Sequence, residues 1–145
     1  MRPDIAAPAG LMALTVLICG CSTVSVADLE ARTPDRVYFT AEHPSIVLSK
    51  MALEGERAVG RPELFDPEAG RLALAHTNWL YRTRYTLLVV RVLPEEGGST
   101  VRMWQDGLQP ITGSTWADWL WAQYAKQAEA SSIEHRLLAK GTPPK

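Results

Sequence analysis

Residues 81–92 read Tyr81-Arg82-Thr83-Arg84-Tyr85-Thr86-Leu87-Leu88-Val89-Val90-Arg91-Val92, and they are the clearest predicted β-strand in this chain of 145 residues. Successive side chains of a strand point to opposite faces of its sheet. The odd-numbered residues from Tyr85 to Val89 therefore point one way, and the even-numbered residues from Leu88 to Val92 point the other. Because the second half of the stretch is apolar on both faces, we expect this strand to lie in the centre of the sheet.

The segments around this strand predict a small α+β domain. Further strands are expected at 35–41, 71–78 and 99–105, a short helix from Pro44 to near 55–58, and a long helix from Trp116 to about Lys140. Turns at 66–70 and 94–98 join neighbouring strands, and 62–66 is a short extended stretch. The predicted order is β-α-β-β-β-α. The apolar residues of these elements can be buried together in a small antiparallel sheet of about four strands, with one short helix and a long C-terminal helix packed on one face.

The last predicted helix carries three of the five tryptophans. Thr115, three residues before Asp118, is typical of a capping box. Residues expected to face the sheet recur at helical spacing: Ala117, Leu120, Trp121, Tyr124, Ala125 and Ala128, continued by Ile133 and Leu137. Trp116, Trp119 and Trp121 lie at about 0°, 300° and 140° around an ideal helix, so they cannot share one face. At least one should be exposed, or should contact the loop at 106–113, a membrane interface or a partner.

An apolar run extends from Ile5 to Ile18 and ends on Ile18-Cys19-Gly20-Cys21. A run of about 14 residues is too short to span a bilayer and suits the apolar region of a secretory signal. Its end resembles the lipobox of bacterial lipoproteins: an aliphatic residue, a tolerant position, a small residue and a cysteine. The resemblance implies a signal peptide over 1–20, a lipid on Cys21, and sorting to the outer membrane by Ser22. The alternatives are an uncleaved signal anchor and a plain apolar N-terminus with a chance cysteine.

The rest of the chain is expected to form a lipidated tether over 21–34, a single domain over 35–140 and a flexible tail over 141–145. A short helical turn at 27–32 is compatible with the tether. The element order and the turn at 66–70 resemble the helix-grip-like domains of small outer-membrane lipoproteins, over about 37–130. That resemblance implies a fold but carries over no functional residue.

Composition excludes some functions and favours none. The 15 basic and 16 acidic side chains form no basic block, so a nucleic-acid partner is not expected. His43, His76 and His135 lack metal-ligand spacing, and we expect neither a metal nor a cofactor. No serine or carboxylate lies in a catalytic pattern, so the chain is not expected to be an enzyme. An envelope hydrolase would need His76 or His135 beside a serine or a carboxylate in a cleft.

Arginines at 82, 84, 91 and 102 fall on neighbouring predicted strands, with Arg102 expected across the hairpin from Arg91. Such a row is either a basic face for anionic lipid headgroups, lipopolysaccharide or peptidoglycan carboxylates, or a solvated face with acids interspersed. Because arginines are mostly exposed to solvent, we expect the solvated face.

These patterns favour a lipid-anchored accessory or interaction module of the bacterial outer membrane that faces the periplasm, within an envelope assembly or secretion complex. Its expected partners are the membrane, through Cys21, and an envelope protein, through the sheet face or through Trp116 and Trp119. The alternative is a lipoprotein that binds a small apolar ligand between the sheet and the C-terminal helix. Residues expected to line that pocket are Trp104, Trp121, Tyr85 and Met103.

Overall fold

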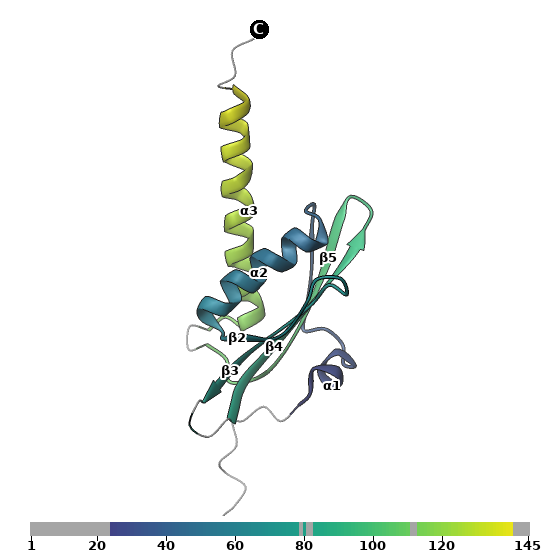
Figure 1. Ribbon diagram of the computed structural model, residues 1–145, viewed down its shortest axis with the longest axis vertical. Helices are drawn as coiled ribbons and strands as arrows, with labels where there is room; N and C mark the ends of the chain where they lie inside the picture. The colour runs from purple at the N-terminus through teal and green to yellow at the C-terminus, as the bar shows by residue number, and fades with distance from the viewer. Residues whose placement is uncertain (1–23, 79, 81–82, 111–112, 141–145) are drawn as a thin grey trace, which may run out of the picture.

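The computed structural model describes residues 24–78, 80, 83–110 and 113–140 (Figure 1). Its elements are α1 (Val26–Glu30), β1 (Arg36–Thr40), α2 (Pro44–Ala58), β2 (Arg61–Asp66), β3 (Arg71–Asn78), β4 (Thr83–Glu95), β5 (Gly98–Gly107) and α3 (Trp116–Lys140). The α+β class is confirmed. The predicted order is wrong at two places, because α1 precedes the first strand and the extended stretch before the 66–70 turn is a fifth strand.

The five strands form one antiparallel sheet in the order β1-β5-β4-β3-β2. The strand predicted to be central, β4, is central. It joins β5 through Glu96 and Gly97, since Glu95 pairs with Gly98. Gly97 has a positive φ of 80°, the left-handed conformation that tight hairpins favour.

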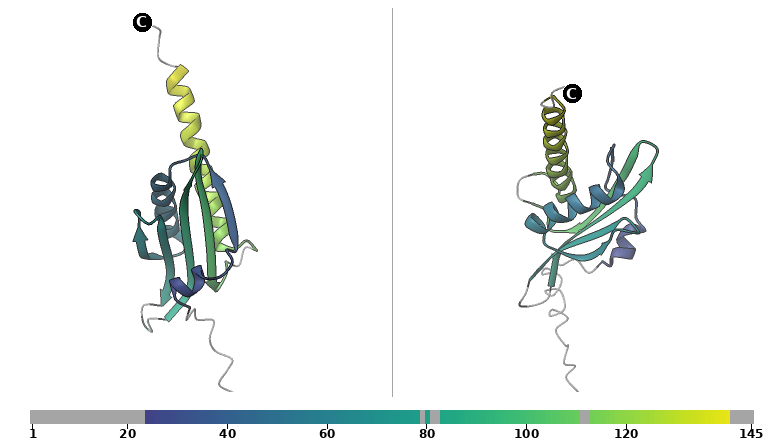
Figure 2. Two further views of the ribbon diagram at one scale, coloured as in Figure 1. Left: turned by 90° about the vertical axis from the view of Figure 1, so that its right-hand side faces the viewer. Right: turned by 45° about the horizontal axis from the view of Figure 1, so that its top comes forward.

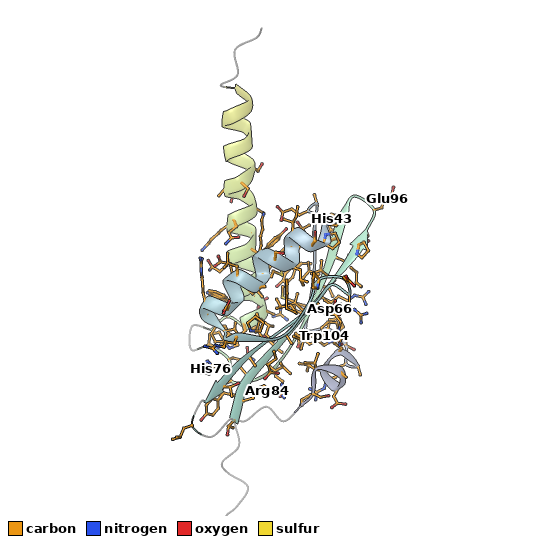
Figure 3. The ribbon with its side chains drawn as sticks, viewed as in Figure 1. His43, Asp66, His76, Arg84, Glu96 and Trp104 are labelled. Atoms are coloured by element: carbon orange, nitrogen blue, oxygen red, sulfur yellow. The ribbon has the colours of Figure 1, made fainter. Side chains whose placement is uncertain are left out.

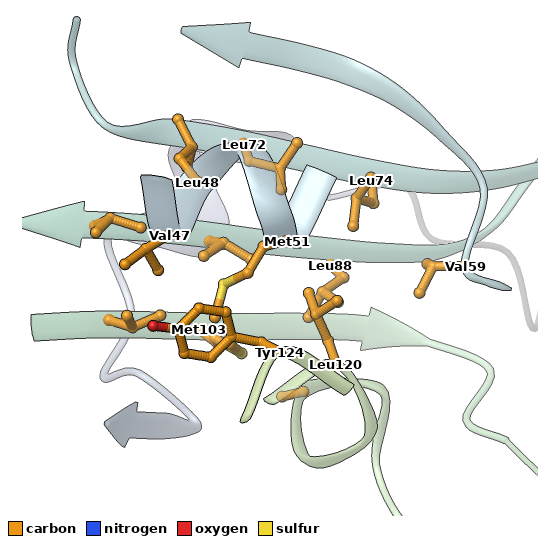
Figure 4. Packing of buried hydrophobic residues seen from close by; sticks show 14 residues of the cluster. Val47, Leu48, Met51, Val59, Leu72, Leu74, Leu88, Met103, Leu120 and Tyr124 are labelled. Carbon is orange, nitrogen blue, oxygen red and sulfur yellow. The ribbon is translucent and has the colours of Figure 1, made fainter. Parts of the chain in front are cut away.

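α2 and α3 cover one face of the sheet (Figures 1 and 2). Leu88 and Val90 of β4 pack there against Met51 of α2 and Leu120 and Tyr124 of α3 (Figure 4). Most of the predicted inward side of α3 is confirmed, including Ala117, Leu120 and Tyr124, which are fully buried. The side chains of Ile133 and Leu137 lie outside the described part of the chain. Ala125 is a correction, because it is exposed. It lies about 140° around the helix from Leu120, outside the stripe that contacts the sheet.

α1 covers part of the opposite face, which the sequence-based fold left without a helix. Leu29 is 1% exposed and packs with Ala73, Leu87, Val89 and Trp104. Ser25 caps α1 by accepting a hydrogen bond from the backbone N–H of Asp28 at 3.1 Å. The segment expected to be a tether therefore contains a short helix packed on the sheet.

β2 is an edge strand that the sequence predicted only as a short extended stretch. Pro62 has no N–H to donate, which argues against a strand except at an edge or a bulge. The structure has both features, because β2 pairs only with β3 and its register shifts between Pro62 and Leu64.

Candidate functional site

The residues expected to line one apolar pocket do not meet. Met103 and Trp104 are neighbours in β5 and point to opposite faces, Met103 towards α2 and α3 and Trp104 towards α1. Trp104 is 4% exposed, and its Nε1 donates to the Arg32 carbonyl at 2.8 Å. Tyr85 lies near the start of β4, with its ring centroid 6.3 Å from that of His76. Of the four residues, only Met103 and Trp121 belong to the cluster beneath α3.

The first turns of α3 form an aromatic base, which we define as Trp116, Trp119 and Trp121 with Tyr38 of β1. Trp121 stacks on Tyr38 with ring centroids 4.3 Å apart and planes 3° apart. Trp116 meets Trp119 edge-on at 6.2 Å, and its Nε1 donates to the Leu108 carbonyl at 3.0 Å. Trp116 thus packs on the loop before α3, one of the contacts predicted. All four side chains remain partly exposed, and the three tryptophans point in different directions around α3.

A polar network beside the aromatic base joins α3 to β1. Arg36 donates from Nε and Nη2 to Asp118 at 2.7 and 3.0 Å, and the Tyr38 hydroxyl donates to the same carboxylate at 2.7 Å. Thr115 caps the helix as predicted, since its Oγ1 accepts from the Asp118 N–H at 3.2 Å. The hydrogen bond from Arg36, followed by that from Tyr38, holds the pKa of Asp118 far below its usual range. Burial, with the bond to Asp118, raises the pKa of Tyr38 to about 12.

The lowered pKa of Asp118 predicts a loss of stability in acid. Because the folded state favours the carboxylate, its contribution is present above the unfolded pKa of about 3.9 and is lost as pH falls below that value. Asp118→Asn should lower the free energy of unfolding at pH 7 by about 1 kcal/mol, a modest value because solvent screens a partly exposed pair. Urea unfolding at pH 7 and pH 3 should show this difference shrinking in acid. Parallel pH profiles for the two proteins would contradict the assignment.

A second network ties the middle of α3 to the start of α2. The Tyr124 hydroxyl donates to Glu42 Oε2 at 2.7 Å and lies 2.6 Å from Thr40 Oγ1. Lys50 pairs with the other oxygen of Glu42 at 2.6 Å. Burial is the main cause that raises the pKa of Tyr124 above its usual value. The two networks fix the first half of α3 on the domain.

In the described part of the chain, the histidines do not lie together with a serine and a free carboxylate in the arrangement of a catalytic site. His43 and His76 lie at opposite ends of the sheet (Figure 3). His76 lines an open hollow of about 490 Å³ with Glu63, but that carboxylate is paired with Arg84 at 2.8 Å. Among the described residues, no three His, Cys, Asp or Glu side chains gather as metal ligands. Cys21, Ser22 and the side chain of His135 lie outside the described residues.

None of the helices in the described ranges is both long and apolar enough to cross a bilayer. Comparison of the chain with protein-family models, with curated proteins and with solved structures finds no match.

Proposed function

We propose that this chain is a lipid-anchored accessory module of the bacterial outer membrane that faces the periplasm and binds an envelope protein through α3. The observation that carries the proposal is the length of α3. Its 25 residues make a helix of about 37 Å, and the C-terminal part of this helix extends past the sheet and α2 (Figures 1 and 2). Among the side chains of α3 that the structure describes, those that pack on the core lie between Trp116 and Ala128.

A projecting helix of about a dozen residues is marginal on its own in water, because most helix stability in proteins comes from packing. Contact with a partner would supply that packing. The aromatic base lies at the other end of the same helix and offers partly exposed tryptophans, which are enriched at protein interfaces. The partner surface in this proposal therefore runs along α3.

The lipobox resemblance at Cys21 supports the anchor. Two or three acyl chains on one cysteine would hold the domain stably, since each buried methylene contributes about 0.8 kcal/mol. We place the fold with the helix-grip-like domains of small outer-membrane lipoproteins, and the function within an envelope assembly or secretion complex. Both assignments are part of the proposal.

Fractionation combined with site-specific photocrosslinking in cells tests the anchor and the partner surface together. A crosslinking residue at Ala130, exposed on the projecting part of α3, should give a discrete adduct of higher mass. The same residue at Glu56, exposed on α2, is the matched control and should not. Cys21→Ala should move the protein out of the membrane fraction. Unchanged partitioning of Cys21→Ala would refute the anchor, and equal adducts at both positions, or none at Ala130, would refute the interface on α3.

A further inference from the structure

Three arginines form a row across the middle of the sheet. Arg71 of β3 pairs directly with Arg91 of β4, and Arg91 pairs directly with Arg102 of β5. Directly opposed residues of antiparallel strands point to the same face, with Cα atoms about 4.5–5.5 Å apart. Arg71 reaches Glu30 of α1, so the row lies on the face that carries α1. Like charges that lie opposite each other on a sheet repel, so nearby negative charges would stabilise this arrangement.

The acidic side chains that contact or lie opposite this row of arginines are all next to Arg71. Glu30 accepts hydrogen bonds from Arg71, one of them at 3.1 Å, and Asp66 is opposite Arg71 on β2. Across the described residues, the side chains of Arg91 and Arg102 form no hydrogen bond or ion pair. Arg91 Nε is buried and has no acceptor. Glu95 lies four residues further along β4, where it accepts from the Thr100 hydroxyl. Two guanidinium charges and one buried donor therefore lack partners.

The part of this face around Arg102 has an apolar rim. α1 crosses only one end of the sheet, and the strands beyond it have no helix in front of them (Figure 2, left). Val37 is opposite Arg102, and Phe39 is opposite Thr100 two residues further along β1. The two side chains are 57% and 54% exposed. Exposed apolar side chains beside unpaired guanidinium groups suit a ligand that is anionic at one end and apolar at the other.

We propose that Arg91 and Arg102 form a binding site for a phosphate monoester group, carried by a molecule whose apolar part lies on Val37 and Phe39. A phosphate monoester carries about −1.5 to −2 charge at neutral pH and three acceptor oxygens. One such group can accept from guanidinium groups on two adjacent strands and offset the charge of both, whereas a carboxylate has two acceptor oxygens and only one negative charge. Binding would relieve the repulsion within the row and, after a small rotation of Arg91, give Nε an acceptor.

The test measures the thermal unfolding midpoint of the full chain in a non-ionic detergent, at constant ionic strength, against the concentration of phenyl phosphate. We expect saturable stabilisation, from which an apparent dissociation constant follows. R91Q and R102Q should each weaken the affinity about tenfold or more, because each removes a charge-assisted contact. K126Q, which removes one exposed positive charge from α3, is the matched control and should change the affinity less than about twofold. R91Q removes an unpaired donor, so this variant should fold at least as stably as the parent.

The remaining arms separate the ligand classes. Phenyl phosphate should bind more tightly than inorganic phosphate, and Phe39→Ser should remove that advantage. Benzoate, which has the same ring and a carboxylate, should bind more weakly than phenyl phosphate. Equal weakening by K126Q, R91Q and R102Q would overturn the site in favour of general charge attraction. Benzoate binding as tightly as phenyl phosphate would overturn the phosphate assignment.

Discussion

Replacing Trp104 by alanine is expected to lower the free energy of unfolding by about 3–5 kcal/mol, the range for removing a buried aromatic side chain. Trp104 fills the space between β5 and α1, where it packs with Leu29, Leu87 and Val89. The substitution also removes the hydrogen bond from Nε1 to the Arg32 carbonyl. Urea unfolding followed by circular dichroism measures the change.

Trp104→Phe is the matched control, because it keeps most of the apolar contact and loses the N–H donor. It should cost about 1–2 kcal/mol, mainly from the hydrogen bond and a smaller ring. Leu29→Ala on α1 opens the same cluster, and the double variant with Trp104→Ala should be less destabilised than the sum of the two, because the residues share contacts. A loss below about 1 kcal/mol for Trp104→Ala would mean that Trp104 is not a core residue.

Replacing Gly107 by alanine is the second substitution expected to have a large effect. Gly107 ends β5 with a positive φ of 90°, and a Cβ placed there would lie 2.0 Å from the Tyr85 carbonyl oxygen. The same oxygen accepts the Leu108 N–H at 2.9 Å. The backbones of β4 and β5 would have to separate, so we expect a loss of about 3–5 kcal/mol from steric overlap and backbone strain together.

Gly97 isolates the contribution of strain. It has a positive φ of 80° in the β4–β5 turn, but a Cβ there meets nothing within 4 Å. Gly97→Ala should therefore cost only about 1–2 kcal/mol, the strain of a left-handed alanine. Both variants can be compared by urea unfolding under one condition. Equal losses at the two positions would show that the close approach at Gly107 contributes nothing.

The sequence predicted the elements that have a strong local pattern. The alternating side chains of β4 and the two glycines after Glu96 were enough to predict the central hairpin. The helical spacing of apolar residues was enough to predict the first half of α3. A helical turn at 27–32 was allowed, and α1 lies there, but its packing on the sheet was not predicted because five residues with one large apolar side chain resemble a linker. Two signals were present: Ser25 and Asp28 have the same capping spacing as Thr115 and Asp118. In addition, Leu87 and Val89 gave β4 a second apolar face that some element had to cover.

The candidate sites were harder to predict, because they depend on which strands become neighbours. The opposition of Arg91 and Arg102 follows from the hairpin and was predicted. The third member, Arg71, joins only when β3 pairs with β4, and the acids that match it come from α1 and β2. The sequence analysis placed both Trp104 and Met103 in the lining of one apolar pocket. They fall on opposite faces because they are consecutive in a strand.

The packing of α1 on the sheet limits how far this domain could move from a lipid anchor at Cys21. If Cys21 is acylated as we propose, only three residue steps separate the lipid from Val24, which packs on the sheet, so the linker between them is at most about 11 Å long. A domain held this closely searches for partners in two dimensions, at a high effective concentration for anything resident on the same leaflet. Targets deeper in the periplasm would have to come to it, or be met by the far tip of α3.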